Sequence, residues 1–116
     1  MDDEKSGLEK LITTAETWAT QTGARLWPKP MPAGFETTFV VQAIRGSVDA
    51  AMSIKHAVLG DDYSWDVTDY EGQGPAATVA HNLQVKSHDV TADNCGKALL
   101  IATVKARLAQ IENSPR

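Results

Sequence analysis

Residues 46–67 read GSVDAAMSIKHAVLGDDYSWDV, and this stretch holds the clearest folding signals of the chain. Ser47 follows a glycine and precedes apolar residues at helical spacing, so we predict that it caps a central helix. Gly60 is the natural end of that helix, because glycine accepts the backbone conformation of a helix terminus. The two aspartates after it, at 61 and 62, favour a turn. A helix, a turn and the start of a strand are therefore expected in sequence.

A strand pair follows the turn. In residues 63–67, apolar and polar side chains alternate, which is the period-two pattern of a half-buried strand. Residues 71–75 form a loop with two glycines, and a second strand follows it. The side chains expected on one face of the second strand are Val79, His81, Leu83 and Val85. We predict an antiparallel hairpin, with residues 86–89 leading out of it.

The last helix is predicted over residues 90–111. Thr91 is the expected N-cap, Asp93 lies in the expected first turn, and Val90 is placed to contact Cys95. The helix carries apolar residues around most of its circumference, from Cys95 to Ile111. A helix of this kind must be covered on more than one side.

The N-terminal third is less regular, and we divide the chain into four segments of one domain. Residues 1–24 form an amphipathic helix with Ser6 as N-cap. Residues 25–34 are a proline-rich connector pinned by Trp27, because alternating prolines favour an extended chain. Residues 35–112 form the core domain, and residues 113–116 are a tail.

Residues 35–44, FETTFVVQAI, fit two structures. Threonine and valine in a row favour a strand, although Phe35, Phe39, Ala43 and Ile44 also fit one face of a helix. We predict a strand, which gives the order αβαββα. The expected fold is α+β, with a small antiparallel sheet (the hairpin plus this third strand) packed against helices.

The composition excludes several functional classes. The 116 residues are 42% hydrophobic with a net charge of −4. No apolar run approaches the roughly 20 residues that span a bilayer, and the acidic N-terminus is not a secretory signal. The single cysteine fits a reducing compartment, so a cytoplasmic, membrane-free protein is expected. The basic residues are scattered, which argues against direct nucleic-acid binding.

The residue pattern contains no familiar catalytic or metal-binding motif. His56, His81 and His88 lie at no metal-ligand spacing from one another or from Cys95, and HExxH and CxxC are absent. We predict that His81 is half-buried and that Cys95 belongs to the core. The sequence therefore predicts no catalytic residue, no metal and no cofactor. The alternative is an enzymatic or small-ligand site near His81, His88 and the acidic run.

Three stretches resemble one family. Residues 47–52 (SVDAAM) open a helix, residues 63–67 (YSWDV) enter a strand after a short turn, and residues 92–108 form an alanine-rich helix. In these stretches, which lie within residues 46–110, the chain resembles the phage ABA sandwich domain family. Residues 60–63 and the start of the last helix at Thr91 depart from the family pattern. The resemblance implies a small α-β-α domain of phage or prophage origin and no particular activity.

These observations favour a non-enzymatic phage or prophage accessory protein that binds another protein, such as a host factor, through an acidic surface. The side chains expected to make the contact are Trp18, Trp27, Asp61, Asp62, Asp66, Asp69 and Glu71. The main alternative is a structural or assembly component, because a small sheet leaves edges through which copies can form a homo-oligomer.

Overall fold

The structure is a computed structural model that describes residues 2–16, 32–70, 74–82 and 87–112. Four helices, a single 3-10 turn and a three-stranded antiparallel sheet make up these residues, and the strand order is β1-β2-β3. The elements are α1 (Asp2–Glu16), α2 (Thr37–Ile44), α3 (Val48–Leu59), the turn η2 (Gly60–Asp62), β1 (Tyr63–Tyr70), β2 (Gly74–His81), β3 (Ser87–Thr91) and α4 (Cys95–Glu112).

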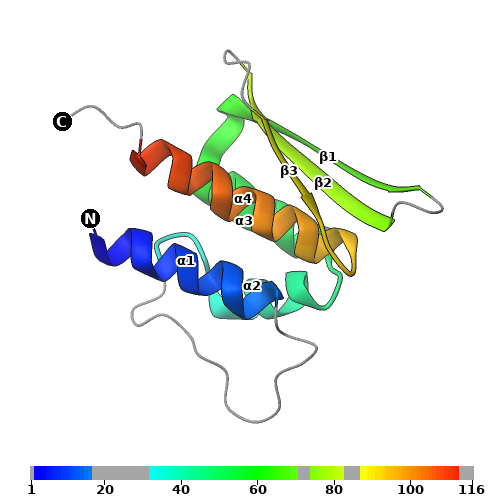
Figure 1. Ribbon diagram of the computed structural model, residues 1–116, viewed down its shortest axis with the longest axis horizontal. Coiled ribbons are helices and arrows are strands. Elements are labelled where there is room, and N and C mark those ends of the chain that lie inside the picture. The colour runs from blue at the N-terminus through cyan, green and yellow to red at the C-terminus, as the bar shows by residue number, and fades with distance from the viewer. Residues whose placement is uncertain (1, 17–31, 71–73, 83–86, 113–116) are drawn as a thin grey trace, which may run out of the picture.

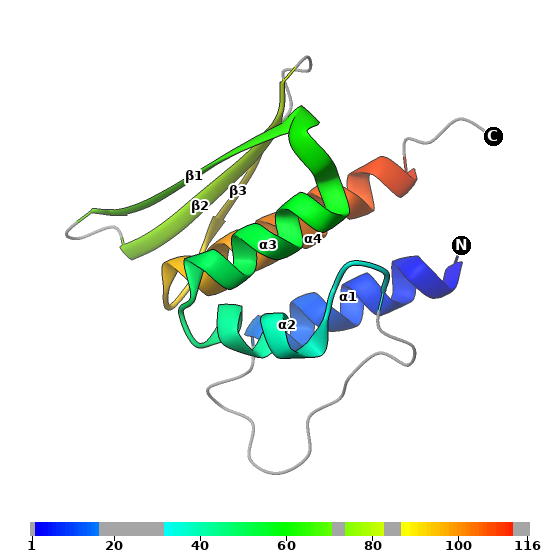
Figure 2. The same cartoon turned by 180° about the vertical axis from the view of Figure 1, so that it is seen from behind.

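The elements form three layers (Figures 1 and 2). The sheet is one outer layer, α3 and α4 lie against one of its faces, and α1 and α2 lie beyond them. No described helix covers the other face of the sheet, so the helices do not enclose it from both sides. No described helix is both long enough and apolar enough to cross a membrane.

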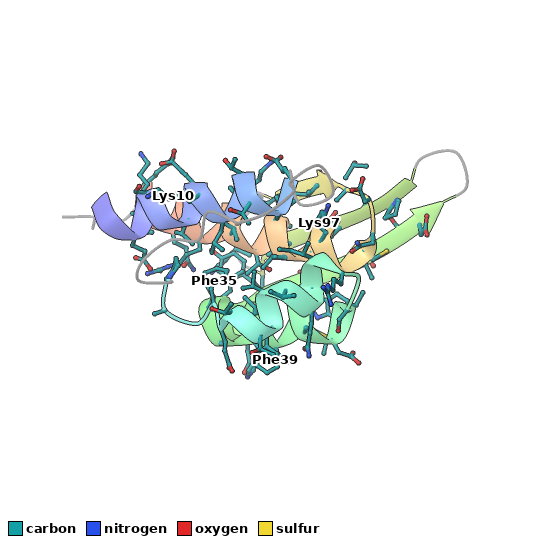
Figure 3. All side chains as sticks on the ribbon, turned by 90° about the horizontal axis from the view of Figure 1, so that it is seen from below. Lys10, Phe35, Phe39 and Lys97 are labelled. Carbon is teal, nitrogen blue, oxygen red and sulfur yellow. The ribbon has the colours of Figure 1, made fainter. Side chains whose placement is uncertain are left out.

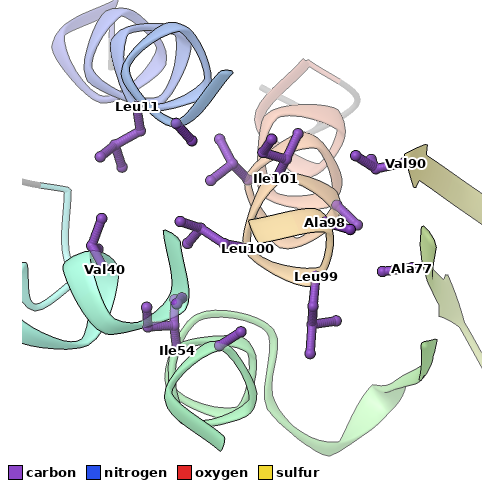
Figure 4. Close-up of a cluster of buried hydrophobic side chains, with 14 of the residues drawn as sticks. Leu11, Val40, Ile54, Ala77, Val90, Ala98, Leu99, Leu100 and Ile101 are labelled. Atoms are coloured by element: carbon purple, nitrogen blue, oxygen red, sulfur yellow. The ribbon is translucent and has the colours of Figure 1, made fainter. Parts of the chain in front are cut away.

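The core is organised around α4. Nine consecutive residues of this helix, 96–104, are buried, so it has neighbours on every side. Figure 4 shows these neighbours: Leu100 points to Val40 of α2, Leu99 points to α3, and Ala98 points to the sheet. The prediction that the last helix is covered on more than one side is confirmed.

The prediction of a strand over residues 35–44 is wrong, because Thr37–Ile44 is the helix α2. Val40, Ala43 and Ile44 are its buried residues, at the spacing of one helical face. A strand would have turned Val40 and Ala43 to opposite faces, so packing on α4 outweighs the β preference of threonine and valine. The α+β class and the antiparallel sheet are confirmed. The third strand is Ser87–Thr91, so the αβαββα order is wrong at its second element and misses this strand.

The predicted central helix and hairpin are confirmed. Ser47 Oγ accepts a hydrogen bond from the Ala50 amide at 3.1 Å, which caps α3. Gly60 ends the helix with a φ of 72°, in the left-handed region that glycine favours. β1 and β2 pair antiparallel from Tyr63 opposite His81 to Tyr70 opposite Gly74. Leu83, Val85 and Glu71 lie outside the described residues.

α1 begins at Asp2, so Ser6 lies inside the helix and is not its cap. The predicted amphipathic character of this helix is confirmed at Leu8, Leu11 and Ala15, which are all buried, and α1 packs on α4. Glu4 forms an ion pair with Arg107 of α4 at 3.1 Å, which links the two ends of the chain. Trp18 and Trp27 lie outside the described residues, as does most of the 25–34 connector.

The predicted N-cap of the last helix is also wrong. Thr91 belongs to β3, and the cap of α4 is Asn94, whose Oδ1 accepts a hydrogen bond from the Lys97 amide at 2.7 Å. The same side chain donates through Nδ2 to the Ile44 carbonyl at 2.9 Å. Asn94 therefore starts α4 and fastens it to the end of α2.

Gly96 lies where α4 crosses the turn between α2 and α3. A Cβ placed on Gly96 would lie 2.5 Å from the Ala43 carbonyl oxygen and 2.8 Å from the Ser47 nitrogen. Both atoms belong to the backbone and cannot rotate away. The two segments approach this closely only because residue 96 has no side chain.

We expect Gly96→Ala to destabilise the fold. Alanine favours helix over glycine by about 1 kcal/mol, but overpacking against fixed backbone typically costs about 1–3 kcal/mol, so the net change is a loss. Chemical denaturation measures it. Lys105→Ala, at an exposed position of α4, is the control and should leave the midpoint nearly unchanged. A Gly96→Ala protein as stable as the wild type would contradict this close approach.

The role of Asn94 can be separated from that of Thr91. Asn94→Ala should lower the free energy of unfolding by about 1–2 kcal/mol, because it removes the helix cap and the partly buried hydrogen bond to the Ile44 carbonyl. Asn94→Ser keeps a capping oxygen and loses the donor to Ile44, so its loss should be smaller. Thr91→Ala should lower the stability less than Asn94→Ala does. The reverse order of stabilities in thermal unfolding would indicate that Thr91 is the cap.

Candidate binding surface

β1 is an edge strand, and its hydrogen-bonding pattern can be assigned. The Asn82 amide donates to the Asp62 carbonyl at 2.8 Å, so these two residues form a hydrogen-bonded pair next to the β1–β2 ladder. Such pairs alternate in antiparallel sheets, and the even-numbered residues of β1 therefore bond to β2. The backbone groups that point to the open edge are those of Tyr63, Trp65, Val67 and Asp69.

No described element pairs with this open edge. Figure 1 shows β1 at the border of the sheet, and β2 is its only hydrogen-bonded neighbour among the described strands. Ser64, Trp65 and Asp66 are consecutive exposed residues of β1. An eight-residue strand thus presents a row of amide and carbonyl groups to solvent.

The two faces of β1 differ in chemistry. On the uncovered face, Asp66 lies opposite Thr78, which lies opposite Asp89, and Thr78 Oγ1 donates to Asp89 Oδ1 at 2.7 Å. On the helix side, Trp65 lies opposite Val79, which is fully buried. Trp65 itself is 38% exposed, because it lies at the open edge of the sheet and not at its centre.

The acidic residues predicted as binding residues are spread along this edge. Asp61 and Asp62 lie in η2 at the start of β1, Asp66 lies on the uncovered face, and Asp69 lies on the opposite face. At about 3.3 Å per residue, the distance from Asp62 to Asp69 is roughly 23 Å. The acids therefore form a line and not a pocket. Trp18, Trp27 and Glu71, the other predicted binding residues, lie outside the described residues.

The side chains of the alternative catalytic site do not converge. His81 and His88 share the helix side of the sheet, since His88 lies opposite Val79 and His81 lies two residues from it. Asp66 lies on the other face. The His81 ring packs edge-on against Tyr63, with 4.9 Å between the ring centroids, as a half-buried histidine can. The described residues contain no group of three potential metal ligands.

Two other candidate residues have structural surroundings. His56 is exposed on α3 and its Nδ1 lies 3.1 Å from the Asp61 carboxylate. Cys95, predicted as a core residue, is half-buried at the first residue of α4, and its Sγ lies 3.7 Å from the Thr68 carbonyl. This contact fixes the start of α4 beneath the edge strand.

A shallow groove of about 410 Å³, which was not predicted, lies between α2 and α3. It is lined by Pro32, Gly34, Phe35, Glu36, Phe39, Ser53 and Ala57. Figure 3 shows Phe35 pointing into the protein and Phe39 pointing outward from α2. The four-residue spacing of Phe35 and Phe39 could have indicated this groove, because it is the spacing of one helical face. The prediction of a strand over these residues led away from it.

Two buried lysines also went unnoticed. The Lys55 ammonium donates to the Gly60 carbonyl at 3.1 Å, which closes the C-terminus of α3. The Lys97 side chain is only 4% exposed, and its Nζ bonds to Asp93 at 3.0 Å. Both lysines bond to a residue just beyond one end of their own helix. Their spacing to those partners, five and four residues, was visible in the sequence.

Comparisons with known protein families, with curated proteins and with solved structures each find no match to this chain. The resemblance to the phage family therefore stays a prediction.

We expect the acids of β1 to keep copies of the protein apart, since like charges across a paired edge repel. The double variant Asp66→Thr, Asp69→Thr should self-associate more than the wild type, because it neutralises the edge and raises its β preference. Light scattering at increasing protein concentration measures this. The control Glu9→Gln, Glu36→Gln changes the net charge equally at exposed sites outside the sheet. Equal behaviour of the two double variants would contradict the expectation.

Proposed function

We propose that this protein is a non-enzymatic binding module that takes up an extended segment of another protein along the open edge of β1. The observation that carries the proposal is the row of outward backbone groups on β1 at Tyr63, Trp65, Val67 and Asp69, which have no partner among the described residues. Strand addition uses such groups for affinity and the neighbouring side chains for specificity.

The charge of the edge supports a different protein, and not a second copy, as the partner. Residues 56–85 contain five acidic residues and no lysine or arginine. Two copies paired through β1 would bring their acids together with no base from either edge to compensate. A homo-oligomeric assembly component is the rival proposal, and the open edge is the feature that favours it.

The proposal includes a phage or prophage accessory role in a host cytoplasm. That part is supported by the resemblance of residues 46–110 alone. An acidic edge suits a basic site on a host factor, because opposite potentials favour encounter and binding. The enzymatic rival has less support, since Asp66 and the two histidines lie on opposite faces of the sheet.

Val67→Pro tests the edge directly. The Val67 amide points to the open edge, so proline removes an outward donor and leaves the β1–β2 ladder intact. Asp66 before it is already extended, the conformation that a following proline requires. The variant should fold, as circular dichroism will show, whereas Thr68→Pro removes a donor to β2 and should be much less stable.

The binding readout is selection from a displayed library of random peptides. The wild type should enrich peptides that bind Val67→Pro at least about tenfold more weakly, a loss of 1.4 kcal/mol or more. Val67→Ala is the control for the lost side chain and should retain most of the binding. Peptides that bind Val67→Pro as well as the wild type would overturn strand addition at β1.

A further inference from the structure

The pairing of the sheet also specifies which segment fits the edge. Resting on the proposed function, we propose that the partner segment alternates basic and apolar residues, with the basic side chains on the face of Asp66 and the apolar side chains on the face of Trp65. The two sides of β1 carry different chemistry at adjacent residues. A bound strand has the same alternation, so each of its faces meets only one of them.

The uncovered face selects for positive charge. A residue of an added strand opposite Asp66 has its Cβ about 5 Å from the Asp66 Cβ, within reach of a lysine or arginine. Asp89 lies on the same face two strands away, at roughly 10 Å, and adds to the potential. The side chains around Asp66 and Asp89 on this face are small, so long basic side chains lie across this part of the sheet without a clash. They are Ser64, Thr68, Ala76, Thr78, Ala80, Ser87 and Thr91.

The helix side selects for apolar residues near the middle of the strand. Trp65 leaves 38% of its surface exposed there, and Val67 next to it is half-buried against the core. A valine or leucine of the bound strand, facing the helices, covers the Trp65 ring and removes apolar surface from water. A basic residue in that position would lose hydration without meeting an acid until Asp69, at the far end of the strand.

The charge pattern disfavours a second copy of the protein as the strand that binds this edge. A second copy of β1 offers Asp66 and no base on the face where the edge calls for bases, and Asp69 on the other face. It would supply backbone hydrogen bonds but no compensating charge, and repulsion between the acids of the two copies would weaken the pair. A basic and apolar strand from a different protein satisfies both faces at once.

Two synthetic peptides of identical composition provide the test. One alternates lysine and valine, and the other carries the same residues in two blocks, so their net charges are equal. Fluorescence anisotropy of labelled peptide at low salt measures both affinities. We expect the alternating peptide to bind at least about tenfold more tightly than the block peptide. Its affinity should fall as salt is added, because these charges are exposed and screened.

Variants assign the two faces. Asp66→Asn and Trp65→Ala should each weaken the alternating peptide several-fold, while Asp49→Asn, at an exposed site on α3, should leave its affinity unchanged. An alternating peptide in which glutamate replaces lysine should not bind. Equal binding of the alternating and block peptides, or no binding of the alternating peptide, would overturn the inference.

The result also separates this inference from the proposed function. If library-selected peptides show no alternation and still depend on Val67, strand addition at β1 stands and the partner pattern is wrong. If Val67→Pro binds every peptide as the wild type does, the proposed function fails. If copies of the protein associate through β1 and release on Val67→Pro, the occupant is a second copy and the inference fails.

Discussion

The burial of α4 on all sides is the constraint on which the rest of the structure depends. A helix with nine consecutive buried residues exposes almost no surface to water, so every other element must supply part of its cover. α1, α2 and α3 cover three sides, and the sheet covers the fourth. Because α1, α2 and α3 all pack around α4, none of the described helices covers the far face of the sheet.

The absence of a described helix on the far face explains the polar character of that face. Around Asp66 and Asp89, the uncovered face of the sheet carries serine and threonine hydroxyls and alanines, as is common for an antiparallel sheet with one solvent-exposed face. The centre of the sheet is protected by pairing on both sides, whereas β1 is not. The proposed partner recognition and the expected resistance to self-association would share the same few residues of β1, so a change that improves one would affect the other.

The sequence predicted those elements whose signals are local. Ser47, Gly60 and the alternation from Tyr63 to Val67 describe their own conformations, and the structure agrees with them. The errors arose where a distant contact decides the outcome. α2 is a helix because α4 covers Val40. Asn94 and not Thr91 caps α4, because Thr91 is the last residue of β3 and pairs within the sheet. The candidate surface was partly predicted, since the acids of β1 and the open edges of a small sheet were identified. The register that arranges these acids along β1 was not.

The crossing at Gly96 has an evolutionary consequence. Gly96, the Ala43 carbonyl and the Asn94 hydrogen bond to Ile44 lie close together, although they belong to segments about fifty residues apart in the sequence. Neither segment has room to change alone, because each is shaped to the backbone of the other. We expect that descendants of this chain either keep both segments or alter both together. The exposed acids of β1, Asp66 and Asp69, have no such tie to the core and are free to diverge.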